Sequence, residues 1–361
     1  MPIEKPPTTS DRGASPGKGG GGKLRSLRLS GSTAPLLAAA AAVLAAGAAL
    51  AMLLASRPPG DDSPEAGFAR DMMVHHAQAV QMAGVVGDKT QSDAMRTLTT
   101  DIELTQQAQI GMMQGWLGEW GLPTTGTQPA MSWMGHPTEG LMPGMAKADE
   151  IDLLRSIPPQ EADKLFLILM IDHHRAAIPM AQATLDRSER PDVVQLAESI
   201  KASQQIEITQ MKEMLASQAG NTLTVDLRPQ HGSHVSGTAI LANTAQGGVR
   251  VEVDASGLPK PNTLYLSHIH PGSCAEGEPP EETGHHHGEH GAGAMAGMEH
   301  AREIEWALNE VRSDASGNGT STTTLEHTSL VELLSGGGLR HLNVHAPGSG
   351  DPPVIACANL Y

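Results

Sequence analysis

The sequence predicts a multidomain protein of α and β structure, with an N-terminal transmembrane helix, a four-helix bundle and then an antiparallel β-sandwich. Three observations predict this order. An uncharged apolar run fills residues 34–55, a duplicated helical pattern fills 67–219, and short β-branched segments separated by Gly, Pro and Asn fill 220–361. At 361 residues and 39% apolar residues, the chain is long enough for two or three domains with cores of their own.

The N-terminal segment has the features of a membrane anchor. Residues 1–31 are rich in Gly, Ser, Pro and Lys without periodicity, and we expect a disordered cytoplasmic tail. The apolar run within 32–56 is long enough to span a bilayer, and basic residues precede it while acidic residues follow it. We therefore expect a single-pass membrane protein with a linker at 57–66 and its domains on the extracytoplasmic side. A signal peptide that is cleaved to release a secreted protein is the alternative.

A pattern of His and Met residues occurs twice in the helical region. Met-x-x-His-His-x5-Met begins at Met72 and again at Met170, 98 residues later. The same offset relates Phe68 to Phe166 and several residues of the helices that follow, which indicates an internal duplication. Two helical hairpins in tandem predict a four-helix bundle.

The repeated residues are suited to a soft metal. Residues three, four and seven positions apart share a face of a helix, so each His pair lies beside its flanking Met residues. Imidazole nitrogen and thioether sulfur bind Cu(I), and imidazole also binds Cu(II). The alternative is that the Met residues only fill the core and the His residues lie on a wet helix surface. The predicted bundle ligands are Met72, His75, His76, Met82, Met113, Met170, His173, His174, Met180 and Met211.

The segments FARDMMVHHAQAVQMA and LFLILMIDHHRAAIPMA, with the connector MPGMAKADEIDLL, resemble the domain of unknown function family 305. The resemblance covers about residues 67–216. It implies a ferritin-like four-helix bundle, in a family whose members are often exported and in some cases bind copper. It also implies that the His and Met residues of the two patterns are metal ligands.

The C-terminal region, predicted to have seven or eight strands, holds a second group of candidate ligands. His268 and His270 end one predicted strand and share a face of it, because side chains alternate along a strand. With His345 at the end of another strand, they can form a copper or zinc site. In the oxidising compartment predicted above, Cys274 and Cys357 are expected to form a disulfide.

The segments SGTAILAN, GGVRVEVDASGLPKPNTLYLSHIHPGSC, SLVELLSGGGLRHLNVHA and VIACANL resemble copper/zinc superoxide dismutase, over about residues 221–361. The resemblance implies a Greek-key β-sandwich, with the three imidazoles as copper ligands and the two cysteines as the structural disulfide. Two features depart from that family. PPVIAC stands where the family has its active-site Arg, and neither the bridging His nor the zinc-ligand loop has a clear equivalent.

These observations predict an extracytoplasmic metal-binding protein that sequesters or buffers copper, with zinc as a further candidate metal. The Gly-, Glu- and His-rich insertion 275–301 is a candidate for additional metal capture. The alternatives are a superoxide dismutase-type enzyme in the C-terminal domain, and scaffold domains that bind no metal. The net charge of -16 argues against a nucleic-acid partner, because phosphate binding needs a basic face. The expected partners are metal ions and the membrane.

Overall fold

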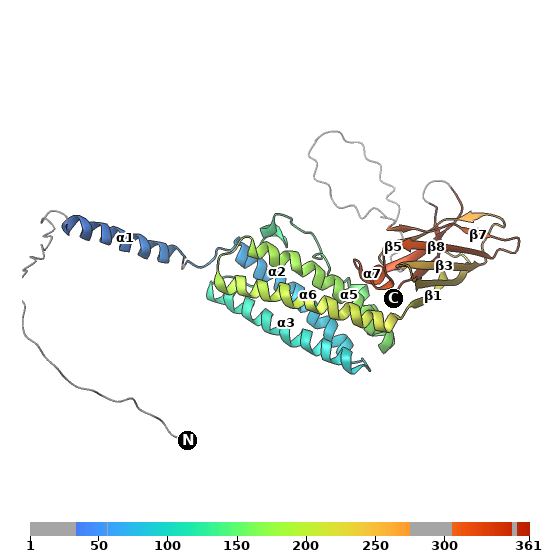
Figure 1. The fold of residues 1–361 in the computed structure, drawn as a ribbon, viewed down its shortest axis with the longest axis horizontal. Coiled ribbons are helices and arrows are strands. Elements are labelled where there is room, and N and C mark those ends of the chain that lie inside the picture. The colour runs from blue at the N-terminus through green and yellow to red at the C-terminus, as the bar shows by residue number, and fades with distance from the viewer. Residues whose placement is uncertain (1–33, 56, 275–304, 349–351) are drawn as a thin grey trace, which may run out of the picture. The chain divides into compact units, whose positions relative to one another are not determined.

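The computed structural model describes four stretches of the chain, residues 34–55, 57–274, 305–348 and 352–361 (Figure 1). The chain divides into two compact units, Met1–Pro58 and Pro59–Tyr361, and the helical bundle and the sheet both lie in the second unit. The tail predicted at 1–31 and the insertion predicted at 275–301 lie outside the described residues.

Helix α1 (Ala34–Ala55) occupies the apolar run near the N-terminus. Within the described stretches, no helix combines the length and the apolar composition that crossing a bilayer requires. The prediction of a transmembrane anchor within residues 32–56 is therefore not supported, although the helix itself is present.

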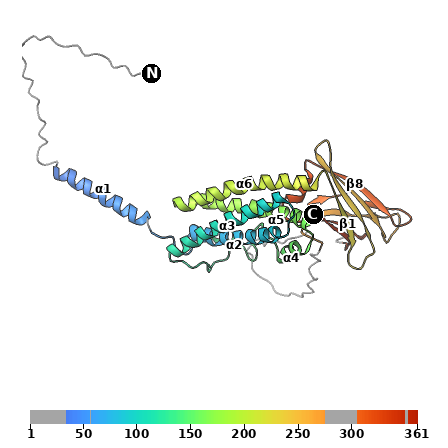
Figure 2. The same cartoon turned by 90° about the horizontal axis from the view of Figure 1, so that it is seen from below.

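Four long helices form the bundle that the duplication predicts (Figures 1 and 2). Their bounds are α2 (Pro64–Gly87), α3 (Asp93–Glu119), α5 (Pro159–Leu185) and α6 (Pro191–Ala219). α2 packs on α3 and α5 packs on α6 to give two hairpins, and α2 also packs on α5. The contact between α2 and α5 brings the two helices that carry the His pairs together.

The helix starts follow from their capping residues. Ser63 and Ser92 precede α2 and α3, and their hydroxyl oxygens accept hydrogen bonds from Ala66 N at 3.2 Å and Met95 N at 3.3 Å. α5 and α6 begin with a proline, whose missing N–H has no helical acceptor at that position anyway. Pro179 lies inside α5, but the helix continues beyond it, so this proline does not end the helix early.

The chain between the two hairpins lies against α2. It contains the short 3₁₀ helix η1 (Ser132–Met134) and the helix α4 (Ala148–Ser156), which was not expected from the sequence. Gln78 of α2 holds this connector through two buried hydrogen bonds. Its Nε2 donates to Ala146 O at 2.8 Å, and its Oε1 accepts from Ala146 N at 2.7 Å.

The C-terminal part is a curled antiparallel sheet, in the order β4-β7-β8-β3-β2-β1-β10-β9-β5-β6 within the described stretches (Figure 1). Its strands are β1 (Thr222–Pro229), β2 (Ser236–Asn243), β3 (Gly248–Ser256), β4 (Leu264–Tyr265), β5 (Ser267–Pro271), β6 (Trp306–Ala307), β7 (Val311–Ser313), β8 (Gly319–Glu326), β9 (Arg340–His345) and β10 (Val354–Asn359). β1 pairs with β2 over most of its length and with β10 at its end, so it joins the two halves of the sheet.

Two features of the sheet differ from the expectation. The strand number exceeds the predicted seven or eight because β4 and β6 are only two residues long and β7 only three. These segments are too short to show an alternating pattern. The helix α7 (Leu330–Ser335) was also not expected, although Ser329 and Glu332 form a capping box at its start.

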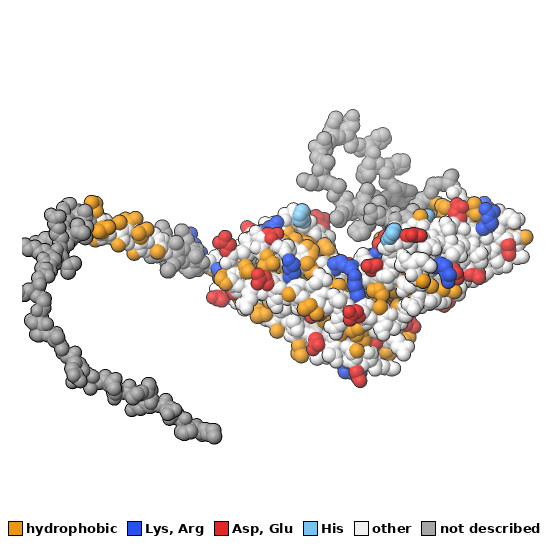
Figure 3. All heavy atoms as spheres, viewed as in Figure 1, with side chains coloured by type: hydrophobic (Ala, Val, Ile, Leu, Met, Phe, Trp, Pro, Cys, Tyr) orange, Lys and Arg blue, Asp and Glu red, His pale blue; other side chains and the backbone are white. Residues whose placement is uncertain are grey.

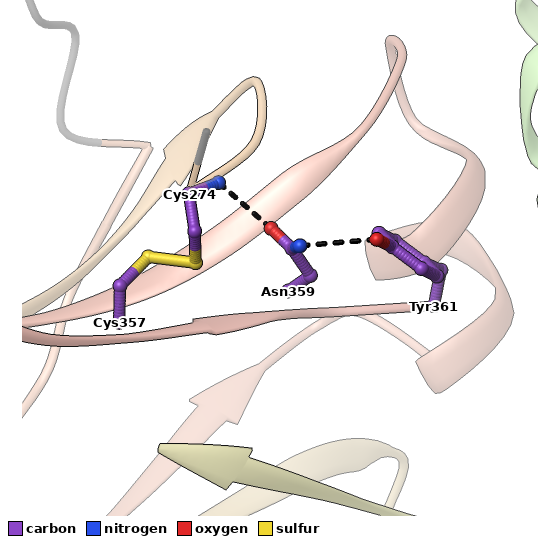
Figure 4. Close-up of a disulfide and its surroundings, with 4 residues drawn as sticks. All are labelled: Cys274, Cys357, Asn359 and Tyr361. Atoms are coloured by element: carbon purple, nitrogen blue, oxygen red, sulfur yellow. Dashed lines mark hydrogen bonds between the residues drawn. A yellow bond between two sulfur atoms is a disulfide. The ribbon is translucent and has the colours of Figure 1, made fainter. Parts of the chain in front are cut away.

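A disulfide joins Cys274 to Cys357, as predicted (Figure 4). It connects the segment after β5 to the last strand, β10, across 83 residues of sequence. Asn359 reinforces the same connection, because its Oδ1 accepts from Cys274 N at 2.8 Å and its Nδ2 donates to Tyr361 OH at 3.0 Å. The strand that carries His268 and His270 is thus tied to the C-terminus.

Candidate metal centres

The histidines of the duplicated pattern lie in the interior of the bundle. His75 and His76 on α2, and His173 and His174 on α5, are each 0% exposed. The ring centroids of His75 and His173 are 3.7 Å apart. The two copies of the pattern therefore meet inside the bundle, which excludes the alternative of histidines on a wet helix surface.

Each of these imidazoles places its Nε2 atom against an oxygen. The oxygens are Pro143 O at 3.4 Å for His75, Gln109 Oε1 at 2.7 Å for His76, His75 O at 3.0 Å for His173, and Glu207 Oε2 at 2.6 Å for His174. These oxygens accept hydrogen bonds, so the hydrogen-bond network assigns the ring proton to Nε2. The Nδ1 atoms of all four rings are buried and have no hydrogen-bond partner. Each ring therefore has one lone pair available for a ligand.

Burial keeps the rings of His75, His76 and His173 neutral. The pKa of His75 is lowered to about 4 and that of His76 to about 3, chiefly by desolvation and in smaller part by neighbouring histidines. Desolvation also lowers the pKa of His173 well below its ordinary value. Neutral imidazole is the form that binds metal ions, so these rings need not lose a proton first at neutral pH.

The methionines of the predicted site are buried, and they divide between two apolar clusters. The first sulfur group is Met72, Met113 and Met180, which belong to one apolar cluster. The second sulfur group is Met82, Met170 and Met211, which belong to another. The offset of 98 residues exchanges the two groups, and each draws on three different helices. The arrangement has the twofold pseudosymmetry that the duplication implies.

Four polar side chains on α3 and α6 were not predicted as site residues. Gln109 and Glu207 hold His76 and His174 as described above. Gln106 and Gln204 are each 2% exposed, and the amide oxygen and nitrogen of both have no hydrogen-bond partner. The 98-residue offset relates the members of both pairs, and it is the sequence signal that points to them.

The connector covers the first histidine of each pattern. Gly144 has a φ of +73°, and a Cβ there would lie 2.5 Å from Ala176 Cβ and 3.1 Å from His173 Cα. Only glycine allows both this backbone conformation and this close approach to α5. The preceding residue, Pro143, supplies the carbonyl oxygen against His75 Nε2.

A second group of histidines lies in the sheet. His268 and His270 come from β5 and His345 from the end of β9, and these two strands are paired. One ligand atom of each residue lies within 4.8 Å of those of the other two. Across the described stretches, these three residues form the only such group of His, Cys, Asp or Glu side chains. The predicted C-terminal ligands are therefore together, whereas the bundle histidines do not form such a group of three within the described stretches.

Neighbouring groups orient the sheet histidines. His345 Nδ1 lies 2.8 Å from Pro352 O, which assigns its proton to Nδ1, and its Nε2 has no hydrogen-bond partner. Desolvation lowers the pKa of His268, and so does His345 beside it. The ring of His341 stacks on that of His270, with ring centroids 5.6 Å apart, although no sequence pattern associates the two residues. Strand pairing, which sets His341 opposite His270, explains this contact.

Comparisons with known proteins concern the bundle. The family model described as "Domain of unknown function (DUF305)" matches residues 65–215. A DUF305 protein from Streptomyces coelicolor, described as secreted, is 41% identical; the match covers 44% of this chain and 96% of that chain, with a TM-score of 0.43. A DUF305 fragment from Deinococcus radiodurans is 34% identical, with 43% and 96% covered and a TM-score of 0.36.

CopM in the Cu(I)-bound form is 27% identical, with 44% of this chain and 99% of that chain covered and a TM-score of 0.34. No curated protein matches the chain. The family match ends at residue 215, so the likeness of the sheet to copper/zinc superoxide dismutase remains a prediction from its sequence. Residues 65–215 of this chain are a domain of the DUF305 family.

Proposed function

We propose that this protein binds copper through the histidines and methionines of its bundle and buffers it outside the cytoplasm. One observation carries the proposal: four buried imidazoles each present Nε2 to an oxygen and leave Nδ1 without a partner. Metal-binding histidines almost always donate their other ring N–H to such an oxygen, which fixes the orientation of the ring. The four rings are therefore in the orientation that a metal ligand needs.

The two sulfur groups favour Cu(I) over harder ions. Thioether sulfur is a soft ligand, and soft ligands select Cu(I) over Mg²⁺, Ca²⁺ or Mn²⁺. The net charge of -16 attracts cations, and acidic side chains lie over both the bundle and the sheet on the face in Figure 3. Binding at buried soft ligands would lower the concentration of free copper and limit its redox reactions.

Two observations support a place outside the cytoplasm. Disulfides such as Cys274–Cys357 persist in oxidising compartments and are rare in the cytosol. The related Streptomyces protein is described as secreted. The Cu(I)-bound structure is one of CopM and not of this chain. The copper proposal for this chain is based on its own histidine and methionine side chains.

A competition titration tests the proposal. The full chain is titrated with Cu(I) against a competing chelator, as wild type and with His75, His76, His173 and His174 changed to Ala. Since loss of an outer-shell partner alone costs about 10–100-fold in affinity, loss of the ligands should cost more. His136→Ala, which changes an exposed histidine, is the control. Equal affinity of the four-histidine variant and the control would contradict a metal site in the bundle.

A second candidate function follows from the sheet. The grouping of His268, His270 and His345 suits copper, and copper that cycles between Cu(I) and Cu(II) there would support superoxide dismutation. The full chain, loaded with copper and zinc, is assayed beside the variant His268→Ala/His345→Ala. A rate above that of free copper, lost in the variant, would support the enzyme. A rate no higher than that of free copper would exclude it.

A further inference from the structure

The two copies of the His pattern differ in the group that holds the second histidine. His76 Nε2 lies 2.7 Å from Gln109 Oε1, and His174 Nε2 lies 2.6 Å from Glu207 Oε2. Each acceptor follows its histidine by 33 residues, so the two contacts are equivalent under the duplication. A neutral amide in the first copy is thus replaced by a carboxylate in the second.

A carboxylate changes what the histidine can do for a metal. Hydrogen bonds to an ionised acceptor are about twice as strong as those between neutral groups, and a carboxylate partner makes the opposite ring nitrogen a better donor. The His174 side chain is 0% exposed and that of Glu207 is 19% exposed, so water screens their interaction only weakly.

Charge balance acts in the same direction. A cation bound at a buried Nδ1 loses its hydration, and the uncharged imidazole and thioether ligands do not neutralise it. Glu207 places a negative charge one imidazole ring away from His174 Nδ1. The group in the equivalent position beside His76 is the uncharged amide of Gln109.

We propose that Glu207 is a positioning residue that makes the second copy the stronger of two metal-binding histidine pairs. Cu(I) held through His174 Nδ1 binds about 10–100-fold more tightly than Cu(I) held through His76 Nδ1. This inference rests on the proposed function of the bundle, and it adds that the duplicated halves are not equivalent. A chain with two such halves buffers copper over a wider concentration range than one with identical halves.

Under the 98-residue offset, Val74 and Ala77 beside the first pair correspond to Asp172 and Arg175 beside the second, and these two opposite charges form an ion pair with each other. The two sulfur groups exchange with each other under the 98-residue offset, and Gln106 corresponds to Gln204. The repeated methionines and the buried amides of Gln106 and Gln204 therefore correspond between the two copies. The hydrogen-bond acceptors of the second histidines differ in charge, since Gln109 is neutral and Glu207 carries a carboxylate.

The test measures Cu(I) affinity of the full chain by chelator competition in two backgrounds. His76→Ala leaves the second copy intact, and there Glu207→Gln should weaken Cu(I) binding about 10–100-fold. His174→Ala leaves the first copy intact, and there Glu207→Gln should have no effect. In that same background Gln109→Glu should tighten binding by a similar factor. General damage to the fold would instead weaken both backgrounds alike.

Glu213→Gln is the matched control, since it removes an equal charge from an exposed position of the same helix. A second set of variants keeps all histidines, in case an alanine variant does not fold. There Glu207→Gln should merge the two binding steps into one, and the exchange Gln109→Glu/Glu207→Gln should restore two steps. Ag⁺ serves as a second probe because it does not cycle between oxidation states under these conditions.

The possible results distinguish the inequality of the two halves from the proposal that the bundle binds copper. If the histidine changes weaken binding but Glu207→Gln matches Glu213→Gln, the inequality of the halves is wrong and the copper site stands. An equal effect of Glu207→Gln in both backgrounds also overturns the inference. If neither His76→Ala nor His174→Ala changes the affinity, the bundle site itself fails.

Discussion

Single residues of the bundle are held in a protonation state that costs stability in acid. His75 and His76 are neutral in the folded protein at neutral pH because burial lowers their pKa values to about 4 and about 3. In the unfolded chain both would titrate near the ordinary value of about 6.5. Keeping these two imidazoles neutral and buried therefore makes the folded protein less stable in acid.

This difference predicts how stability depends on pH. As the pH falls below 6.5, the unfolded chain takes up protons that folded His75 and His76 do not, so the free energy of unfolding decreases. One pKa unit is worth about 1.4 kcal/mol per group, so the metal-free protein should lose on the order of a few kcal/mol between pH 7 and 4.5. Urea unfolding at a series of pH values measures this loss of unfolding free energy.

Carboxylates set the limit of that pH window. Burial raises the pKa values of Asp71 and Asp172, and these groups favour the folded state as the pH falls into the carboxylate range. The decrease should therefore be steepest about one pH unit below 6.5, where the unfolded imidazoles are almost fully protonated and the folded ones are not. His76→Asn should flatten it, while the exposed His136→Asn should not. A stability that is constant from pH 7 to 5.5 would show that the histidines are not buried as neutral groups.

Residue types were easier to predict than their partners. The candidate His and Met ligands of the bundle follow from helical spacing and repetition, both of which can be read directly from the sequence. The oxygen beside each Nε2 comes from another helix or from the connector, as Pro143 does for His75, 68 residues away. Such a pairing depends on how the hairpins pack. The same packing divides the sulfur atoms into two groups, where spacing alone allowed all of them to meet.

Secondary-structure elements were predictable where their pattern was long. The four bundle helices have caps, prolines and apolar faces that mark their limits, and together they span Pro64 to Ala219, close to the helical region predicted at 67–219. The helix α7 is six residues long, too short to establish a period beside the strands around it. The pairing of β5 with β9 joins segments far apart in the sequence, and local patterns do not predict such a pairing. The sheet site was instead expected from the strand positions of its histidines and from the family resemblance.

The disulfide between the segment after β5 and strand β10 should stabilise the folded protein. Closing a loop between residues 83 apart restricts the unfolded chain, and for that length the loop-entropy relation gives about 4–5 kcal/mol. The variant Cys274→Ser/Cys357→Ser should therefore unfold in less urea, with a loss of roughly 3–5 kcal/mol. Reduced wild type is the companion sample and should behave like the variant. Equal stability of the oxidised and the double-serine chains would contradict this.

The whole molecule combines two kinds of candidate metal centre in one chain. The bundle offers imidazole with thioether in a buried, pseudosymmetric interior, and the sheet offers three imidazoles within a few ångströms. Softer ligands favour Cu(I), whereas imidazole alone also suits Cu(II) and Zn²⁺. Under the proposed function, copper in the bundle would therefore have the higher Cu(II)/Cu(I) reduction potential, and the sheet would suit Cu(II) or Zn²⁺.

The central claim is that the bundle binds Cu(I) through histidine Nδ1 and methionine sulfur. The most direct measurement is anomalous scattering at the copper edge from crystals of the full chain loaded with Cu(I) under reducing conditions. The account predicts copper peaks inside the bundle, bonded to Nδ1 of one or more of the four histidines and to sulfur atoms of the two sulfur groups. Copper found only in the sheet or on the surface, with every bundle Nδ1 uncoordinated, would contradict it.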